Sequence, residues 1–89
     1  MDPRPLLINL ETPYSEYSAK APVKDVLLAG LRWETQYWVS LAVSWIEQSA
    51  PIDNEIKEAL DNVAQKRHFP QSLRHKAFAI ARKWERANA

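Results

Sequence analysis

Residues 31–48 read LRWETQYWVSLAVSWIEQ, and this stretch decides the fold class. It contains three of the four tryptophans of the chain and neither proline nor glycine. On a helix of 3.6 residues per turn, its large apolar side chains fall on one broad face. Because burial of each large side chain is worth roughly 1.5–3 kcal/mol, other helices are expected to cover that face. The predicted face comprises Leu31, Trp38, Leu41, Ala42, Trp45 and Ile46.

The composition is that of one small globular domain, since the 89 residues are 46% hydrophobic and 26% charged. A single glycine argues against a turn-rich β-protein. The absence of cysteine excludes disulfides, thiolate metal sites and cysteine nucleophiles. No signal peptide is recognised, and the longest apolar run is about half a membrane span. We therefore expect a soluble, cytoplasmic protein without a membrane partner.

Prolines mark the expected helix boundaries, because all six lie in residues 1–22 or next to a break at Pro51 or Pro70. We predict an all-α fold, a small antiparallel bundle with helices at about residues 23–29, 31–49, 53–66 and 70–86. Asp53 is expected to cap the third helix. Gly30 either ends the first helix or lies inside a longer one, and we favour a break there. The antiparallel pairing resembles a HEAT-like unit in architecture, without a motif or an internal repeat.

Residues 1–21 are predicted to form an extended segment packed on a helical domain of residues 22–87. The apolar run LLINL at residues 6–10 argues against a freely solvated tail. Trp33 and Tyr37 are four residues apart at the edge of the predicted central helix. They are either covered by this run or exposed as an apolar patch suited to a partner.

Catalytic and cofactor-binding patterns are missing from the sequence. His68 and His75 are the only histidines, and their spacing matches no zinc motif. One glycine cannot build a phosphate-binding loop. We therefore expect no enzymatic activity, no catalytic residue, no cofactor, no metal and no small-molecule substrate.

Glu34 falls at the border of the predicted buried face, where a carboxylate needs a partner. The basic start of the last helix offers one, and we hypothesise a structural pair of Glu34 with Arg74 or with His75. A role for Glu34 as a general acid or base is the weaker alternative.

Charge is segregated along the chain. Residues 1–65 carry five Lys/Arg against ten Asp/Glu, whereas residues 66–89 carry seven against one. Two interpretations fit this pattern: acidic early helices that pair with a basic last helix, or a basic binding face.

The outward side of the last helix is the main candidate surface, because it places a phenylalanine among cations. Phenylalanine and arginine are enriched at protein interfaces, and both also contact nucleic acids. We expect a non-catalytic protein–protein interaction module with a protein partner or a homodimer. One alternative is a nucleic-acid-binding accessory protein that uses the basic C-terminal helix. The other is a plain solvated helix face without a binding role. The candidate interaction residues are Arg74, His75, Phe78, Arg82 and Arg86, together with Trp33 and Tyr37.

Overall fold

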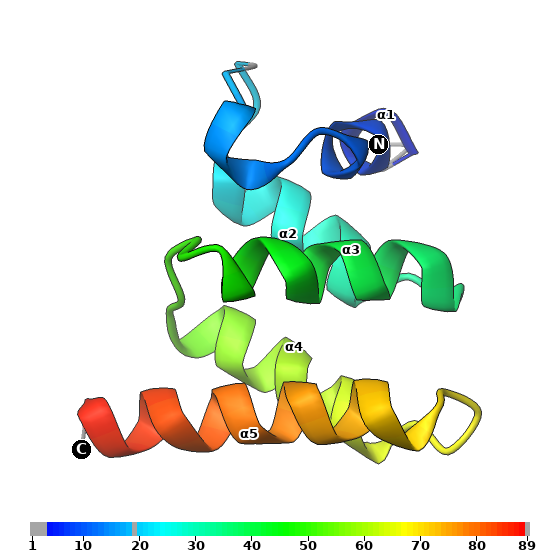
Figure 1. The fold of residues 1–89 in the computed structure, drawn as a ribbon, viewed down its shortest axis with the longest axis vertical. Helices are drawn as coiled ribbons and strands as arrows, with labels where there is room; N and C mark the ends of the chain where they lie inside the picture. The colour runs from blue at the N-terminus through cyan, green and yellow to red at the C-terminus, as the bar shows by residue number, and fades with distance from the viewer. Residues whose placement is uncertain (1–3, 19, 89) are drawn as a thin grey trace. The chain divides into compact units, whose positions relative to one another are not determined.

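The computed structural model describes residues 4–18 and 20–88, and these residues form helices and no strand (Figure 1). The all-α prediction is confirmed. The chain divides into two compact units, Met1–Pro51 and Ile52–Ala89, so the expected helical domain of residues 22–87 spans the boundary between them. The elements are α1 (Arg4–Leu7), the 3₁₀ helices η1 (Ile8–Glu11) and η2 (Tyr14–Glu16), α2 (Val23–Leu31), α3 (Gln36–Glu47), α4 (Asn54–Gln65) and α5 (Gln71–Ala87).

The start of the first unit is helical, so the prediction of an extended segment is wrong for residues 6–10. These residues form the end of α1 and most of η1, and they pack against α2 and α3. Leu7 and Leu10 are buried, whereas Ile8 is 64% exposed. The physical reason is their spacing, because leucines three residues apart share one side of a helical turn. Residues 1–3 and 19 of the predicted segment lie outside the described residues.

Gly30 lies inside α2, where it allows the helix to approach its neighbours closely. A β-carbon at Gly30 would lie 2.6 Å from Cδ1 of Leu10 and 2.9 Å from Cβ of Ala42. The helix ends one residue later, at Leu31, and the backbone N–H of Arg32 closes it by donating to the carbonyl of Leu28 at 3.0 Å. The break in the helix that was predicted at Gly30 therefore begins two residues later, at Arg32.

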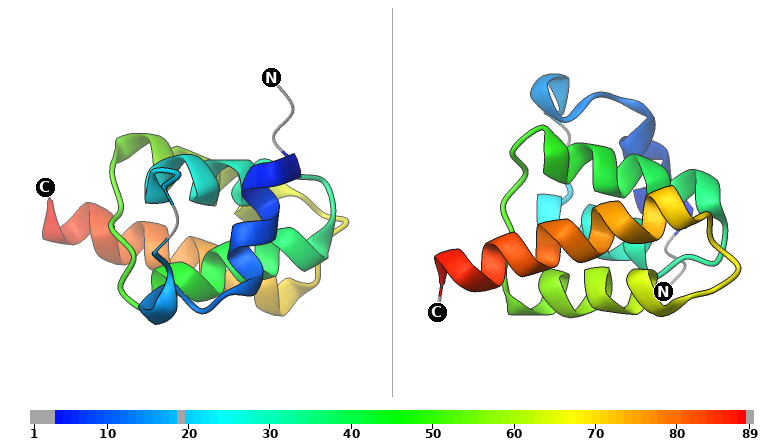
Figure 2. Two further views of the ribbon diagram at one scale, coloured as in Figure 1. Left: turned by 90° about the horizontal axis from the view of Figure 1, so that it is seen from above. Right: turned by 60° about the horizontal axis from the view of Figure 1, so that its bottom comes forward.

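The long central helix begins at Gln36 and not at residue 31 as predicted. Residues 32–35 are not helical, and they let the chain reverse so that α3 packs beside α2 in the opposite direction (Figure 2). Thr35 precedes α3 with an extended backbone. The buried face of α3 is also rotated relative to the prediction, since Val39 and Val43 are buried while Trp38 and Leu41 are only half-buried.

Trp45 anchors the residues between η1 and α2 to α3. Its ring packs at a tilt against Tyr14 and Tyr17, with ring centroids 5.6 and 4.9 Å away. Its Nε1–H donates a hydrogen bond to the carbonyl oxygen of Thr12 at 2.9 Å. The two tyrosines of this loop therefore serve as packing partners for a buried tryptophan.

The C-terminus of α3 is a Schellman motif, in which the two residues after the cap bond back to the last turn. Ala50 N–H donates to Trp45 O at 3.1 Å, and Ser49 N–H donates to Ile46 O at 3.0 Å. Ser49 has the left-handed φ of 89° that this motif requires. The helix thus ends four residues before Pro51, which was expected to stop it.

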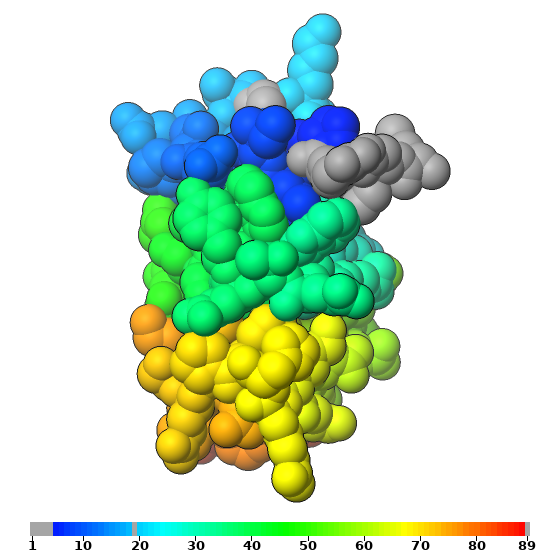
Figure 3. Space-filling view, turned by 90° about the vertical axis from the view of Figure 1, so that its right-hand side faces the viewer, coloured from blue at the N-terminus to red at the C-terminus, as the bar shows by residue number. Residues whose placement is uncertain are grey.

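The second unit is a hairpin of two antiparallel helices, α4 and α5 (Figures 1 and 2). Asp53 caps α4 as predicted, because its Oδ1 accepts a hydrogen bond from Ile56 N–H at 2.9 Å. Pro70 precedes α5 rather than opening it, since its ψ of 148° is extended. The connection between the helices forms part of the surface in Figure 3 (yellow). The buried residues of this unit are Ile56, Ala59, Leu60, Val63, Phe69, Leu73, Ala77 and Ala81.

Candidate interaction groove

One side of the hairpin carries a line of facing side chains, which we call the α4–α5 seam. Spacings of four and three residues place each set on one face of its helix. The antiparallel packing brings the start of α4 against the end of α5, as the contact of Lys57 with Glu85 shows. The seam consists of Lys57, Asp61 and Ala64 on α4 and of Phe78, Arg82 and Glu85 on α5.

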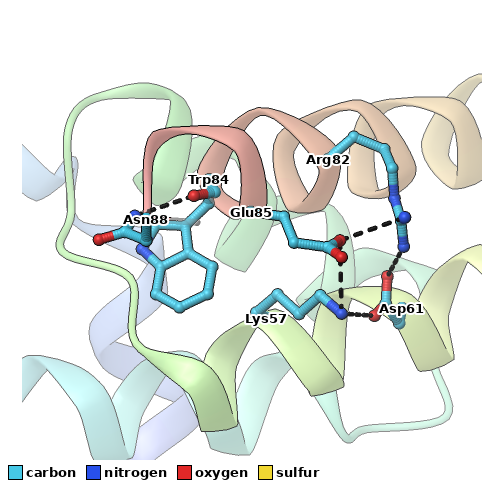
Figure 4. Close-up of polar contacts among 6 residues, drawn as sticks. All are labelled: Lys57, Asp61, Arg82, Trp84, Glu85 and Asn88. Atoms are coloured by element: carbon cyan, nitrogen blue, oxygen red, sulfur yellow. Dashed lines mark hydrogen bonds and ion pairs between the residues drawn. The ribbon is translucent and has the colours of Figure 1, made fainter.

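A cluster of four charged side chains fills one end of the seam (Figure 4). Lys57 Nζ lies 2.8 Å from an oxygen of Asp61 and 3.6 Å from one of Glu85. Arg82 contacts the same two carboxylates, at 3.8 Å from Asp61 and 3.2 Å from Glu85. The cluster is therefore neutral, with two cations and two anions. The hydrogen bond to Asp61 is the main reason why the pKa of Lys57 is raised.

The last turn of α5 is closed beside this cluster by its own cap. Asn88 donates its side-chain Nδ2–H to the carbonyl oxygen of Trp84 at 2.8 Å (Figure 4). The backbone N–H of Asn88 donates to the same oxygen at 3.1 Å. The end of α5 that carries Glu85 is thereby held in helical geometry.

The other end of the seam is open, and it forms a groove of about 360 Å³. The small side chain of Ala64 stands here in line with Lys57 and Asp61, so it leaves space between the helices. Phe78 contributes an apolar wall with 52% of its surface exposed. The residues that line this α4–α5 groove are Ala64, Gln71, Arg74, His75 and Phe78.

Polar groups surround the apolar wall of the groove. The Nε–H of Arg74 is buried and has no hydrogen-bond acceptor among the described residues. Gln71 Nε2 lies 3.5 Å from His75 Nε2, one turn apart along the rim. The guanidinium carbon of Arg82 lies 5.2 Å from the centre of the Phe78 ring, which is a cation–π distance. The groove therefore combines an aromatic surface with several hydrogen-bond donors.

The seven predicted interaction residues are distributed over three places. Three of them, Arg74, His75 and Phe78, line the groove together. Arg82 is exposed but engaged with two carboxylates, and Arg86 is exposed one turn further on. The remaining two belong to the first unit.

The prediction that Trp33 and Tyr37 share a helix edge is wrong, because Trp33 lies in the connection of residues 32–35, before α3 begins. Trp33 is half-buried and lines a second groove, of about 350 Å³, with Arg32, Glu34 and Thr35. Glu34 is exposed there, so the premise that it lies at the border of a buried face, where it would need a partner, is wrong.

Tyr37 lies in the first turn of α3 and is 51% exposed. It is tethered to η1, since its hydroxyl donates to Glu11 Oε2 at 2.8 Å. This hydrogen bond is the main cause of the raised pKa of Tyr37, with desolvation and the charge of Glu11 acting in the same direction. The contact of Tyr37 is therefore with the residue that follows the run 6–10, and half of the side chain stays exposed.

Ala64 and Gln71 line the groove but are not among the candidate residues that the sequence pattern indicates. Ala64 is half-buried on α4. The available signal was the pattern Lys57, Asp61, Ala64, in which a small residue follows two charged ones on the same face.

Comparisons with protein-family models, curated proteins and solved structures found no match for the chain. Within residues 4–18 and 20–88, no group of three histidine or acidic side chains is placed to hold a metal ion. No helix in the same part of the chain combines the length and the apolar composition needed to cross a membrane.

Proposed function

We propose that this chain is a non-catalytic interaction module that binds a protein partner through the α4–α5 groove. The observation that carries the proposal is Phe78, a large apolar side chain that stays half-exposed on the wall of a groove. Aromatic residues in such positions are typical anchors of protein interfaces. Arginine, which lines the same groove at position 74, is also enriched there. The cytoplasm remains the location that we expect for such a module.

Nucleic-acid binding is the second candidate, and the exposed cations Lys83 and Arg86 on α5 favour it. Such binding draws its strength from several phosphate contacts made at once. Arg82 lies between these cations and the groove, but Asp61 and Glu85 already neutralise it. We therefore rank a protein partner above a nucleic acid.

The proposal is tested by selecting phage-displayed peptides on the wild-type chain and measuring their binding to variants. Phe78→Ala removes the aromatic wall, and Arg74→Met removes the guanidinium while keeping much of the aliphatic stem. Arg86→Met is the matched control, because Arg86 is exposed on the same helix outside the groove. We expect both groove variants to weaken the selected peptides at least about tenfold and the control to leave them unchanged.

Peptides that bind both groove variants as tightly as wild type would refute the proposal. Binding of a mixed oligonucleotide that falls steeply between about 50 and about 200 mM salt would support the second candidate instead. Sedimentation equilibrium of wild type and Phe78→Ala asks whether a second copy of the chain is the partner. A dimer that dissociates in the variant would identify the groove as a homodimer interface.

A further inference from the structure

We infer that the α4–α5 groove accepts the carboxylate of an acidic side chain from a partner peptide, next to an apolar side chain that packs on Phe78. This inference rests on the proposed function and specifies the chemistry of the partner. Three observations on the second unit carry it: an unsatisfied donor, an uncompensated charge and an aromatic wall.

The unsatisfied donor is the Nε–H of Arg74, which is buried without an acceptor among the described residues. A buried donor without a partner is unfavourable, because it has lost water and gained no hydrogen bond. The side chain of Arg74 lines the groove, so a small turn of its guanidinium lets the Nε–H donate to a partner oxygen that enters there. A carboxylate oxygen accepts best, because hydrogen bonds between two charged groups are the stronger ones.

The positive charge at the groove is uncompensated, because the nearby carboxylates are engaged in the cluster at the other end of the seam. Asp61 and Glu85 both contact Lys57 and Arg82, so these two carboxylates are already neutralised. No acidic residue is among those that line the groove. The unit as a whole carries eight Lys/Arg against five Asp/Glu, a net charge of +3. An anionic group is therefore the complementary occupant.

The aromatic wall determines which kind of side chain lies next to the carboxylate in the partner peptide. Phe78 and Ala64 offer apolar surface in the same groove as Arg74. A peptide satisfies both at once, with an acidic side chain on the donors and a neighbouring aliphatic or aromatic side chain on the ring. A nucleic-acid strand would need a series of available cations, whereas Arg82, the next cation beside Phe78, is held by carboxylates.

The test compares two pools of acetylated and amidated nonapeptides on the ¹⁵N-labelled chain. One pool has glutamate fixed at the centre and Ala, Ser, Leu, Ile and Phe at random elsewhere. The other pool is identical except that glutamine is fixed at the centre, so that the central carboxylate is the only difference in charge. NMR follows the Arg74 Nε–Hε signal and the backbone amides of Ala64 and Phe78.

We expect the glutamate pool to shift all three signals, and its apparent affinity to exceed that of the glutamine pool at least about tenfold. Arg74→Met is expected to lower the affinity of the glutamate pool to that of the glutamine pool. Arg86→Met is the control and should keep the wild-type preference. Because the preference for glutamate is measured on wild type, the test stands even if Arg74→Met unfolds.

The outcomes distinguish a failure of the carboxylate inference from a failure of the proposed function. Equal binding of both pools, with shifts at Ala64 and Phe78, would overturn the carboxylate inference and leave the proposed interaction groove intact. A groove that responds to neither pool would overturn the inference together with the proposed function. Shifts caused by an oligothymidine strand alone, weakened steeply by salt, would overturn both in favour of nucleic-acid binding.

Discussion

A β-carbon on Gly30 would lie 2.9 Å from the β-carbon of Ala42, which shows how closely α2 approaches α3. Cδ1 of Leu10 would lie 2.6 Å away and the carbonyl oxygen of Trp38 3.2 Å away. A leucine methyl group can rotate aside, but Cβ of Ala42 moves only with its helix. The only glycine of the chain therefore serves helix packing.

Gly30→Ala is predicted to destabilise the chain, although alanine favours helix over glycine by about 1 kcal/mol. Overpacking a closed contact costs about 1–3 kcal/mol, and the need to separate two helices places this site at the upper end. Urea unfolding followed by circular dichroism measures the difference. Leu10→Ala removes a buried side chain and is costly by itself, but it should cost less in the Gly30→Ala background than in wild type, because it relieves one of the two close contacts. A Gly30→Ala chain more stable than wild type would contradict this packing.

A helix boundary could be predicted from the sequence where a capping residue or a proline marks it locally. Asp53 and Pro70 are such signals, and the two helices of the second unit begin within one residue of their predicted starts. The start of α3 was missed because Leu31 and Trp38 are seven residues apart and keep the same helical phase. A helical wheel cannot detect a four-residue interruption between two positions in phase.

The groove residues on α5 could be named from the sequence as an outward surface, whereas the contribution of α4 could not. The outward face of α5 could be read from one helix, and it contained Arg74, His75 and Phe78. The participation of Ala64 depends on the register of α4 against α5, which is a tertiary property. The neutralisation of Arg82 by Asp61 depends on the same register and reduces the predicted basic face.

Ser49→Gly is predicted to stabilise the chain by about 0.5–1 kcal/mol. Ser49 has a φ of 89°, a conformation that strains every residue with a β-carbon and leaves glycine unstrained. Glycine is accordingly the usual residue at this position of a Schellman motif. The control is Ser44→Gly inside α3, which should lose about 1 kcal/mol at most of helix propensity. Thermal unfolding that shows a loss for both variants would contradict the assigned cap.

Trp45→Phe is predicted to destabilise the first unit although an aromatic ring remains. The phenyl ring cannot donate to the carbonyl of Thr12, which the indole Nε1–H reaches at 2.9 Å. Loss of this hydrogen bond costs about 0.5–1.5 kcal/mol, beyond the smaller area packed against Tyr14 and Tyr17. Urea unfolding measures the loss, and Trp84→Phe, at a half-buried site on α5, should cost less. Equal losses in both variants would argue against the hydrogen bond.

The stability of the chain is predicted to fall at alkaline pH, partly through Tyr37. Its hydrogen bond to Glu11 raises the pKa of Tyr37 in the folded state. The folded chain therefore binds the hydroxyl proton of Tyr37 more tightly than the unfolded chain does, in which the pKa of tyrosine is about 10. The resulting stabilisation is complete below about pH 10 and is lost as the pH rises through the raised pKa.

Tyr37→Phe should flatten the alkaline decline in the guanidinium unfolding midpoint, measured from about pH 9 to about pH 11. Lys57 also has a raised pKa and contributes to the same decline, so Lys57→Met serves as the companion variant. Glu11→Gln keeps an acceptor but removes the charge, and Tyr37 should then ionise at lower pH in an absorbance titration near 295 nm. If wild type and Tyr37→Phe lose stability equally above about pH 10, the hydrogen bond between Tyr37 and Glu11 does not contribute to the alkaline decline.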